Sequence, residues 1–211
     1  MTDAVLAGVA AHNAGEYAVA SAIWAGEAPV DPERHDAEVD EFDAANRLLD
    51  GLAAFATAVT GSRRGDWSAA LDAATAAELA FDAVADDEGI DLAPIERWLA
   101  AFDADPELAE RSSPPTVAVD GDRPTPGELP IAAAAVVAGA VAAARGDGPD
   151  VVADALRFAR EAEHPETTRY ATFLRDYAAA DPSQRAIVFE RLSGVVAQER
   201  RKEDDVAGLF E

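Results

Sequence analysis

The residues that most often carry acid–base or metal chemistry are isolated from one another in this chain. Its three histidines, His12, His35 and His164, have no second histidine at the spacing that places two ligands on one face of a helix. His35 is followed by Asp36, Glu38 and Asp40, and carboxylates beside an imidazole can hold a cation. Because such runs are usually solvated surface, we predict no metal site and no cofactor.

No nucleophile is set up for covalent catalysis either. The chain has no cysteine, which excludes disulfides, thiolate nucleophiles and thiolate metal sites. Ser62 and Ser193 have no histidine at a predictable position, and residues 146–149 lack the lysine and the preceding strand of a phosphate-binding loop. The sequence therefore predicts no catalytic residue.

Glu78 and His12 are two titratable residues that need a separate interpretation. Glu78 lies three and four positions from Phe81 and Ala74, on a face expected to be buried. A buried carboxylate needs a partner such as Arg47, or its pKa rises. A small rotation of that helix exposes Glu78, and this is the interpretation we favour. His12 ends the first predicted helix, where packing or capping is more common than catalysis.

A six-residue phrase that occurs twice predicts the elements that position these residues. Residues 15–20 read Gly-Glu-Tyr-Ala-Val-Ala and residues 65–70 read Gly-Asp-Trp-Ser-Ala-Ala, each before an apolar helical pattern. Glycine can leave a helix in a left-handed conformation, the acid suits the start of the next helix, and the aromatic begins a buried stripe. Each phrase therefore predicts the bend of an antiparallel helical hairpin.

The N-terminal part is predicted to be a set of stacked helical hairpins of the tetratricopeptide-like kind. The apolar spacing indicates helices at 2–13, 16–26, 36–60, 66–86, 92–104 and 106–111. Gly51, Ala54 and Ala58 form a small-residue strip where a neighbouring helix can approach closely. Stacked hairpins leave a concave groove between them. The residues predicted to line this groove are Asn13, Tyr17, Ser21, Trp24, Arg47 and Glu78.

A segment rich in proline and glycine, residues 112–130, interrupts the helical pattern. We expect it to cross the surface in extended form, with 116–119 as a short strand. Helices are predicted again at 131–145, 150–162, 165–179 and 184–202, and the apolar run 131–144 is too short to span a membrane. The predicted all-α fold thus has a helical-hairpin core (1–111), a connector (112–130) and a C-terminal helical region (131–211) that packs on the core.

The composition is strongly acidic. The chain has 41 acidic and 17 basic residues, a formal net charge of −24, and Lys202 as its single lysine. Like charges of this number repel one another within a compact fold. Molar salt shortens the Debye length to about 3 Å and screens this repulsion, so we predict a halophilic protein, the alternative being an acidic mesophilic one.

An acidic surface repels phosphate backbones and anionic lipids, so no nucleic-acid or membrane partner is expected. The first residues lack the pattern of a signal peptide, which favours a cytoplasmic location.

Five stretches of the sequence carry a family resemblance. Residues 13–17 (Asn-Ala-Gly-Glu-Tyr) with the helix through Trp24, residues 49–52 (Leu-Asp-Gly-Leu) and the second phrase at 65–70 resemble the domain-of-unknown-function family 309. Residues 111–115 and 187–210 look like the C-terminal region of its haloarchaeal members. The resemblance implies an all-helical fold and no assigned activity. Members typically place a histidine and two acids where this chain has Ser21, Ala22 and Ala25, so it resembles a degenerate member.

These observations lead to three functional hypotheses. We predict a non-enzymatic adaptor that binds another protein or peptide in the hairpin groove. The alternative is an enzyme or a small-ligand-binding protein with a pocket among the first four helices that uses Glu78, Arg47 or His12. In the third hypothesis, the apolar residues 206–210 dock on a neighbouring molecule and the protein self-associates. The sequence does not reveal the oligomeric state.

Overall fold

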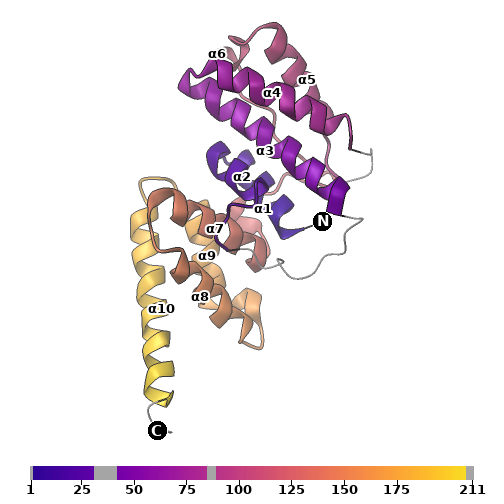
Figure 1. Ribbon diagram of the computed structural model, residues 1–211. Coiled ribbons are helices and arrows are strands. Elements are labelled where there is room, and N and C mark those ends of the chain that lie inside the picture. The colour runs from indigo at the N-terminus through magenta and orange to yellow at the C-terminus, as the bar shows by residue number, and fades with distance from the viewer. Residues whose placement is uncertain (1, 31–41, 85–88, 208–211) are drawn as a thin grey trace.

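The computed structural model describes residues 2–30, 42–84 and 89–207. Within these residues the backbone forms ten α-helices, two short 3-10 helices and no strand, so the predicted all-α class is confirmed (Figure 1). The elements are α1 (Asp3–Asn13), α2 (Tyr17–Trp24), α3 (Phe42–Arg64), α4 (Trp67–Phe81), α5 (Ala93–Ala104), α6 (Leu108–Arg111), η1 (Pro126–Glu128), α7 (Ile131–Arg145), α8 (Pro149–Arg160), η2 (Pro165–Thr167), α9 (Arg169–Ala179) and α10 (Arg185–Ala207).

The two repeated phrases form the two predicted bends. Gly15 and Gly65 separate α1 from α2 and α3 from α4, with φ angles of +83° and +75°. The Glu16 N–H donates to the Ala11 carbonyl at 2.9 Å, and the Asp66 N–H donates five residues back at 3.0 Å. This is the hydrogen-bond pattern of a Schellman helix end, which favours glycine because side chains with a Cβ resist positive φ. The tetratricopeptide-like stacking of the two hairpins is not confirmed.

Helices α3 and α4 pack closely because small residues face each other along the pair. A Cβ added to Gly51 would lie 2.5 Å from the Phe81 ring, and one added to Gly61 would lie 3.2 Å from the Ala70 Cβ. The small-residue strip predicted from the sequence therefore contains a real point of close approach, at Gly51. The low residue numbers of one helix meet the high numbers of the other, so the pair is antiparallel.

Helix α7 lies at the centre of the molecule. Eleven of its residues between Ile131 and Ala142 are buried, and it packs against α1, α2, α8 and α9. The C-terminal region therefore contacts the first hairpin directly. The alanine-rich run 131–144 therefore forms a buried helix. None of the helices in the described ranges is long and apolar enough to cross a bilayer.

The connector differs from its predicted form. Residues 116–119 are not a strand in the structure, and Val119 makes only isolated bridges to Ile90 and Asp122. Asp120 and Gly121 both have positive φ angles, 51° and 87°, which is the geometry of a type I′ turn. The connector does not simply cross the surface, because the side chains of Val117 and Val119 are buried.

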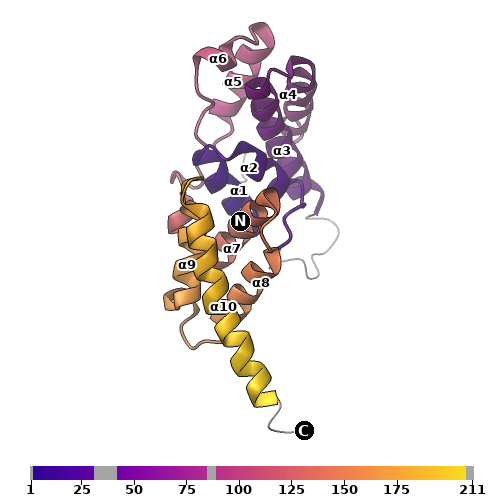
Figure 2. The same cartoon turned by 90° about the vertical axis from the view of Figure 1, so that its left-hand side faces the viewer.

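Ion pairs attach α10 to the rest of the protein. The buried Arg185 guanidinium donates to Glu16 at 2.6 Å, which joins the start of α10 to the first glycine bend. Farther along, Arg157 of α8 donates to both carboxylate oxygens of Glu203, at 2.8 and 3.0 Å. The end of α10 extends beyond the helices that it packs on, away from α4, α5 and α6 (Figures 1 and 2).

Candidate functional site

Asn13 faces the connector and not an open groove. Its side-chain amide donates to the carbonyls of Val117 (2.9 Å) and Pro124 (3.3 Å), and its side-chain oxygen accepts from the Val117 N–H at 2.8 Å. An asparagine amide offers two donors and an acceptor, so it can pair with both the carbonyl and the N–H of one extended residue. Asn13 therefore holds the connector against the end of α1.

His12 lies in an aromatic cluster with its ring almost fully buried. Its Nε2 is 2.9 Å from the Pro115 carbonyl, which can only accept, so Nε2 carries the proton. The centroid of the His12 ring lies 4.9 Å from that of Tyr17 and 5.1 Å from that of Phe55. Nδ1 is buried and has no hydrogen-bond partner among the described residues. A substrate could not reach this nitrogen, so His12 serves packing and does not act as a general base.

Acidification is expected to destabilise the fold through His12. Burial lowers the pKa of this imidazole below its usual 6.5, which the hydrogen bond from Nε2 to Pro115 only partly opposes. As the pH falls, the imidazole is therefore protonated in the unfolded chain before it is protonated in the folded one. The stability that the neutral ring contributes is complete above about pH 6.5 and is lost as the pH falls below it. Unfolding free energies measured from pH 8 to pH 5 should fall more steeply for the wild type than for H12Q, which keeps a donor for Pro115. Parallel curves would contradict this.

Trp24 belongs to the core. Its side chain is 2% exposed, and its indole Nε1 has no hydrogen-bond partner among the described residues. A Cβ on Gly8 of α1 would lie 2.2 Å from that nitrogen, so the indole lies directly over the glycine. Trp24 therefore stabilises the α1–α2 pair and cannot line an open groove.

Tyr17 and Arg47, which we predicted to share the groove, lie far apart. The basic residue beside Tyr17 is Arg63, whose guanidinium carbon is 4.8 Å from the ring centroid. Arg47 is exposed near the start of α3, sixteen residues before Arg63. At 1.5 Å per residue this separation is about 24 Å along the helix. The predicted groove is therefore not one continuous site.

Glu78 is half-buried on α4, between the two alternatives weighed from the sequence. Gly51 faces Phe81 in the antiparallel α3–α4 pair. Arg47 lies one turn before Gly51 on α3, and Glu78 lies one turn before Phe81 on α4. Because the helices run in opposite directions, these two steps move the residues apart. The geometry does not make Arg47 the counterion of Glu78.

Ser21 lines a cleft of about 290 Å³, the α2–α3–α4 cleft. Its hydroxyl and that of Thr57 both lie within donating distance of the Ala53 carbonyl, at 3.2 and 2.8 Å, and 2.9 Å from each other. Their protons are thus used inside the protein, and the hydroxyl oxygens remain as acceptors. The full lining is Ala18, Ser21, Ala22, Glu27, Thr57, Thr60, Gly61, Arg64, Asp66 and Ala69.

A second cleft, of about 580 Å³, lies on the other side of the α3–α4 bend, against α6. Its lining is Ser62, Arg63, Arg64, Gly65, Trp67, Ala109 and Glu110, so Arg64 lines both clefts. Arg63 and Arg64 form no ion pair with any described residue, and the Trp67 side chain is half-buried. We call Tyr17, Arg63, Arg64 and Trp67 the Arg–Trp surface.

Three of these four residues were missed by reasoning from the sequence. Trp67, the aromatic residue of the second phrase, was predicted to begin a buried stripe, and neither arginine was predicted to belong to a site. The available signal was the Arg63-Arg64 pair directly before the second glycine bend, in a chain with few basic residues. What the sequence could not show is that α2 brings Tyr17 to the same place as Arg63.

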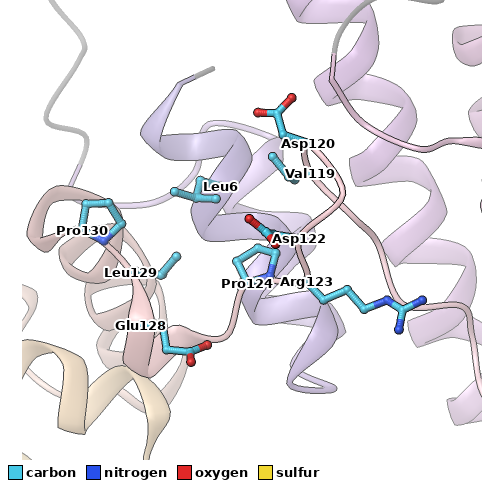
Figure 3. A pocket seen from close by; sticks show the side chains of 9 residues that line it. All are labelled: Leu6, Val119, Asp120, Asp122, Arg123, Pro124, Glu128, Leu129 and Pro130. Carbon is cyan, nitrogen blue, oxygen red and sulfur yellow. The ribbon is translucent and has the colours of Figure 1, made fainter.

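A third cleft, of about 500 Å³, lies between α1 and the connector (Figure 3). Leu6, Pro124, Leu129 and Pro130 face one another across it, and the Arg123 side chain extends away (Figure 3). The rest of its lining is Val119, Asp120, Asp122 and Glu128. Among the described residues this cleft holds no nucleophile paired with a base, and its lining combines apolar side chains with three carboxylates.

The described part of the chain contains no group of three or more His, Asp or Glu residues placed to hold a metal ion. The acidic run after His35 lies outside the described residues. No family model, curated protein or solved structure matches the chain. The resemblance to the domain-of-unknown-function family 309 therefore stays a prediction.

Proposed function

We propose that this protein is a helical adaptor that binds a segment of another protein at the Arg–Trp surface. The observation that carries the proposal is a pair of arginines, unpaired within the described residues, beside a half-buried tryptophan and between two clefts. Tryptophan, tyrosine and arginine are the residues that most often dominate protein–protein binding energy. We also propose that it works in a salt-rich cytoplasm, which the acid excess supports.

The charge of the surface indicates what kind of segment binds. In a chain with a net charge of −24, most of the surface repels acidic partners. Arg63 and Arg64 place two positive charges side by side, although Asp66 and Glu110 line the same clefts. Guanidinium groups pair with carboxylates in bidentate geometry. The half-buried Trp67 ring adds an apolar contact beside them. An acidic segment that also carries an apolar side chain is therefore the partner that fits.

Capture from an extract in molar salt tests the proposal. The tagged wild type is compared with R63E/R64E and with R97E/R160E, a matched control in which two exposed arginines of α5 and α8 are reversed. We expect a reproducible partner on the wild type and on the control, and at least tenfold less of it on R63E/R64E. The same partners at equal amounts on all three proteins would reject the Arg–Trp surface.

A small ligand in the α2–α3–α4 cleft is the second candidate. Its volume of about 290 Å³ is at the lower end of small-molecule sites, and its hydroxyl oxygens can accept hydrogen bonds. A metabolite panel screened by thermal shift would support this candidate if one compound raised the Tm of the wild type but not of A22L. The leucine in that variant fills the cleft. A compound of this kind would replace the adaptor proposal.

A further inference from the structure

We propose that the segment bound at the Arg–Trp surface is residues 203–211 of a second copy of this chain, so that the protein assembles head to tail. This inference rests on the proposed function and names its partner. The segment reads Glu-Asp-Asp-Val-Ala-Gly-Leu-Phe-Glu, in which acids precede apolar residues. That is the chemistry derived above for the occupant of the surface.

The acids of this segment are available for a partner. Glu203 is held by Arg157 within the chain. The next two residues, Asp204 and Asp205, are exposed, and their side chains form no hydrogen bond or ion pair with the described residues. They lie in the last turns of α10, which fix their position relative to the body. Residues 208–211 lie outside the described part and enter the argument through their sequence alone.

The two matching surfaces lie near opposite ends of α10, because Arg185 at its start contacts Glu16, next to Tyr17, whereas Asp204 and Asp205 lie in its last turns. The cleft beside Trp67 is closed on one side by α6, which both views place at the far end from the C-terminus of α10 (Figures 1 and 2). Four residues after Ala207 span at most about 14 Å in extended form. The segment therefore reaches the Arg–Trp surface of another copy and not its own. Such a contact joins two different patches, and it continues into a chain or closes into a ring.

Charge selects this contact over others between two copies. Both copies carry a net charge of −24, so most pairs of surfaces bring like charges together, which repel strongly in dilute salt and weakly in molar salt. Asp204 and Asp205 against Arg63 and Arg64 bring opposite charges together, and salt screens such pairs less once the contact partly buries them. The apolar residues Leu209 and Phe210 can then pack against Trp67.

Light scattering on the full chain in molar salt tests the assembly. The wild type should show a mass that rises with protein concentration. R64E and D204R/D205R should each stay monomeric over the same range. The Arg64 side chain makes no hydrogen bond or ion pair with the described residues, so R64E should keep the fold. The variant that combines R63E/R64E with D204R/D205R again has opposite charges on the two surfaces, with their signs exchanged. Its mass should again rise with protein concentration. A wild type that remains monomeric at all concentrations overturns the proposal.

A labelled peptide of residues 203–211 separates this proposal from the proposed function. Fluorescence anisotropy should show saturable binding of the peptide to D204R/D205R, a variant whose Arg–Trp surface is not occupied by another copy. Binding of the peptide to R63E/R64E should be at least tenfold weaker, and a scrambled peptide should not bind. No binding of the peptide, together with a foreign partner captured through Arg63 and Arg64, would overturn the self-assembly and leave the adaptor in place. Equal binding of the peptide to R63E/R64E and to the control R97E/R160E would overturn the self-assembly at this surface, and equal capture of partners by these two variants would overturn the adaptor.

Discussion

A Gly8→Ala variant is expected to lose about 3 kcal/mol of unfolding free energy, although alanine is the better helix former. The new Cβ would lie 2.2 Å from the Trp24 Nε1 and 2.4 Å from its Cε2, far inside van der Waals contact. Trp24 is 2% exposed, so its ring has no free space into which it can move. The α1–α2 pair must then separate, and the aromatic cluster around His12 loses contacts. Urea unfolding in molar salt measures the effect.

Gly194→Ala is the matched control, because it makes the same substitution in the middle of a helix. A Cβ at Gly194 of α10 meets no atom within 4 Å. This variant should therefore gain about 0.5–1 kcal/mol from helix propensity alone. In the double variant G8A/W24F the smaller ring should recover part of the loss. A G8A protein as stable as G194A would show that Trp24 does not lie over Gly8.

An Asn13→Ala variant is expected to lose about 3 kcal/mol and to free the connector. It removes three hydrogen bonds and leaves the N–H and carbonyl of Val117 without their partner, at a residue whose exposure is 0%. Each buried backbone group that is left unsatisfied costs about 1–3 kcal/mol. Limited proteolysis should cut between residues 112 and 130 sooner in N13A than in the wild type, and urea unfolding gives the energy.

Thr125→Ala is the control for the connector. The Thr125 hydroxyl donates to Glu128 at 2.6 Å in an exposed part of the same segment. Loss of one exposed hydrogen bond should change the stability by less than about 0.5 kcal/mol and leave the cleavage rate unchanged. If N13A and T125A were cleaved at the same rate, Asn13 would not hold the connector.

The predicted helices agree with the structure where local signals are strong. The bends at Gly15 and Gly65 and the helix beginning at Ile131 were expected from residues that lie next to one another in the sequence. The connector at 116–119 was expected to be a strand because its composition suits one. A strand needs a partner strand, and here the Asn13 side chain takes that role.

The candidate site could be predicted only in part. Of the six predicted residues, Tyr17 belongs to the Arg–Trp surface and Ser21 lines the adjoining cleft. Trp24 is buried over Gly8, and Asn13 is used by the connector. Each had the residue type expected of a groove. What decided its role was which other segment packed on it.

The amino-acid sequence by itself determined that the chain is all-helical, where its helices bend and which faces of them are apolar. These properties depend on backbone conformations and on spacings of a few residues. Only the tertiary structure decided that Arg63, and not Arg47, meets Tyr17, and that a connector more than a hundred residues away covers His12. The physical reason is that contacts between helices depend on how whole faces fit together, and an apolar face does not specify which partner it buries.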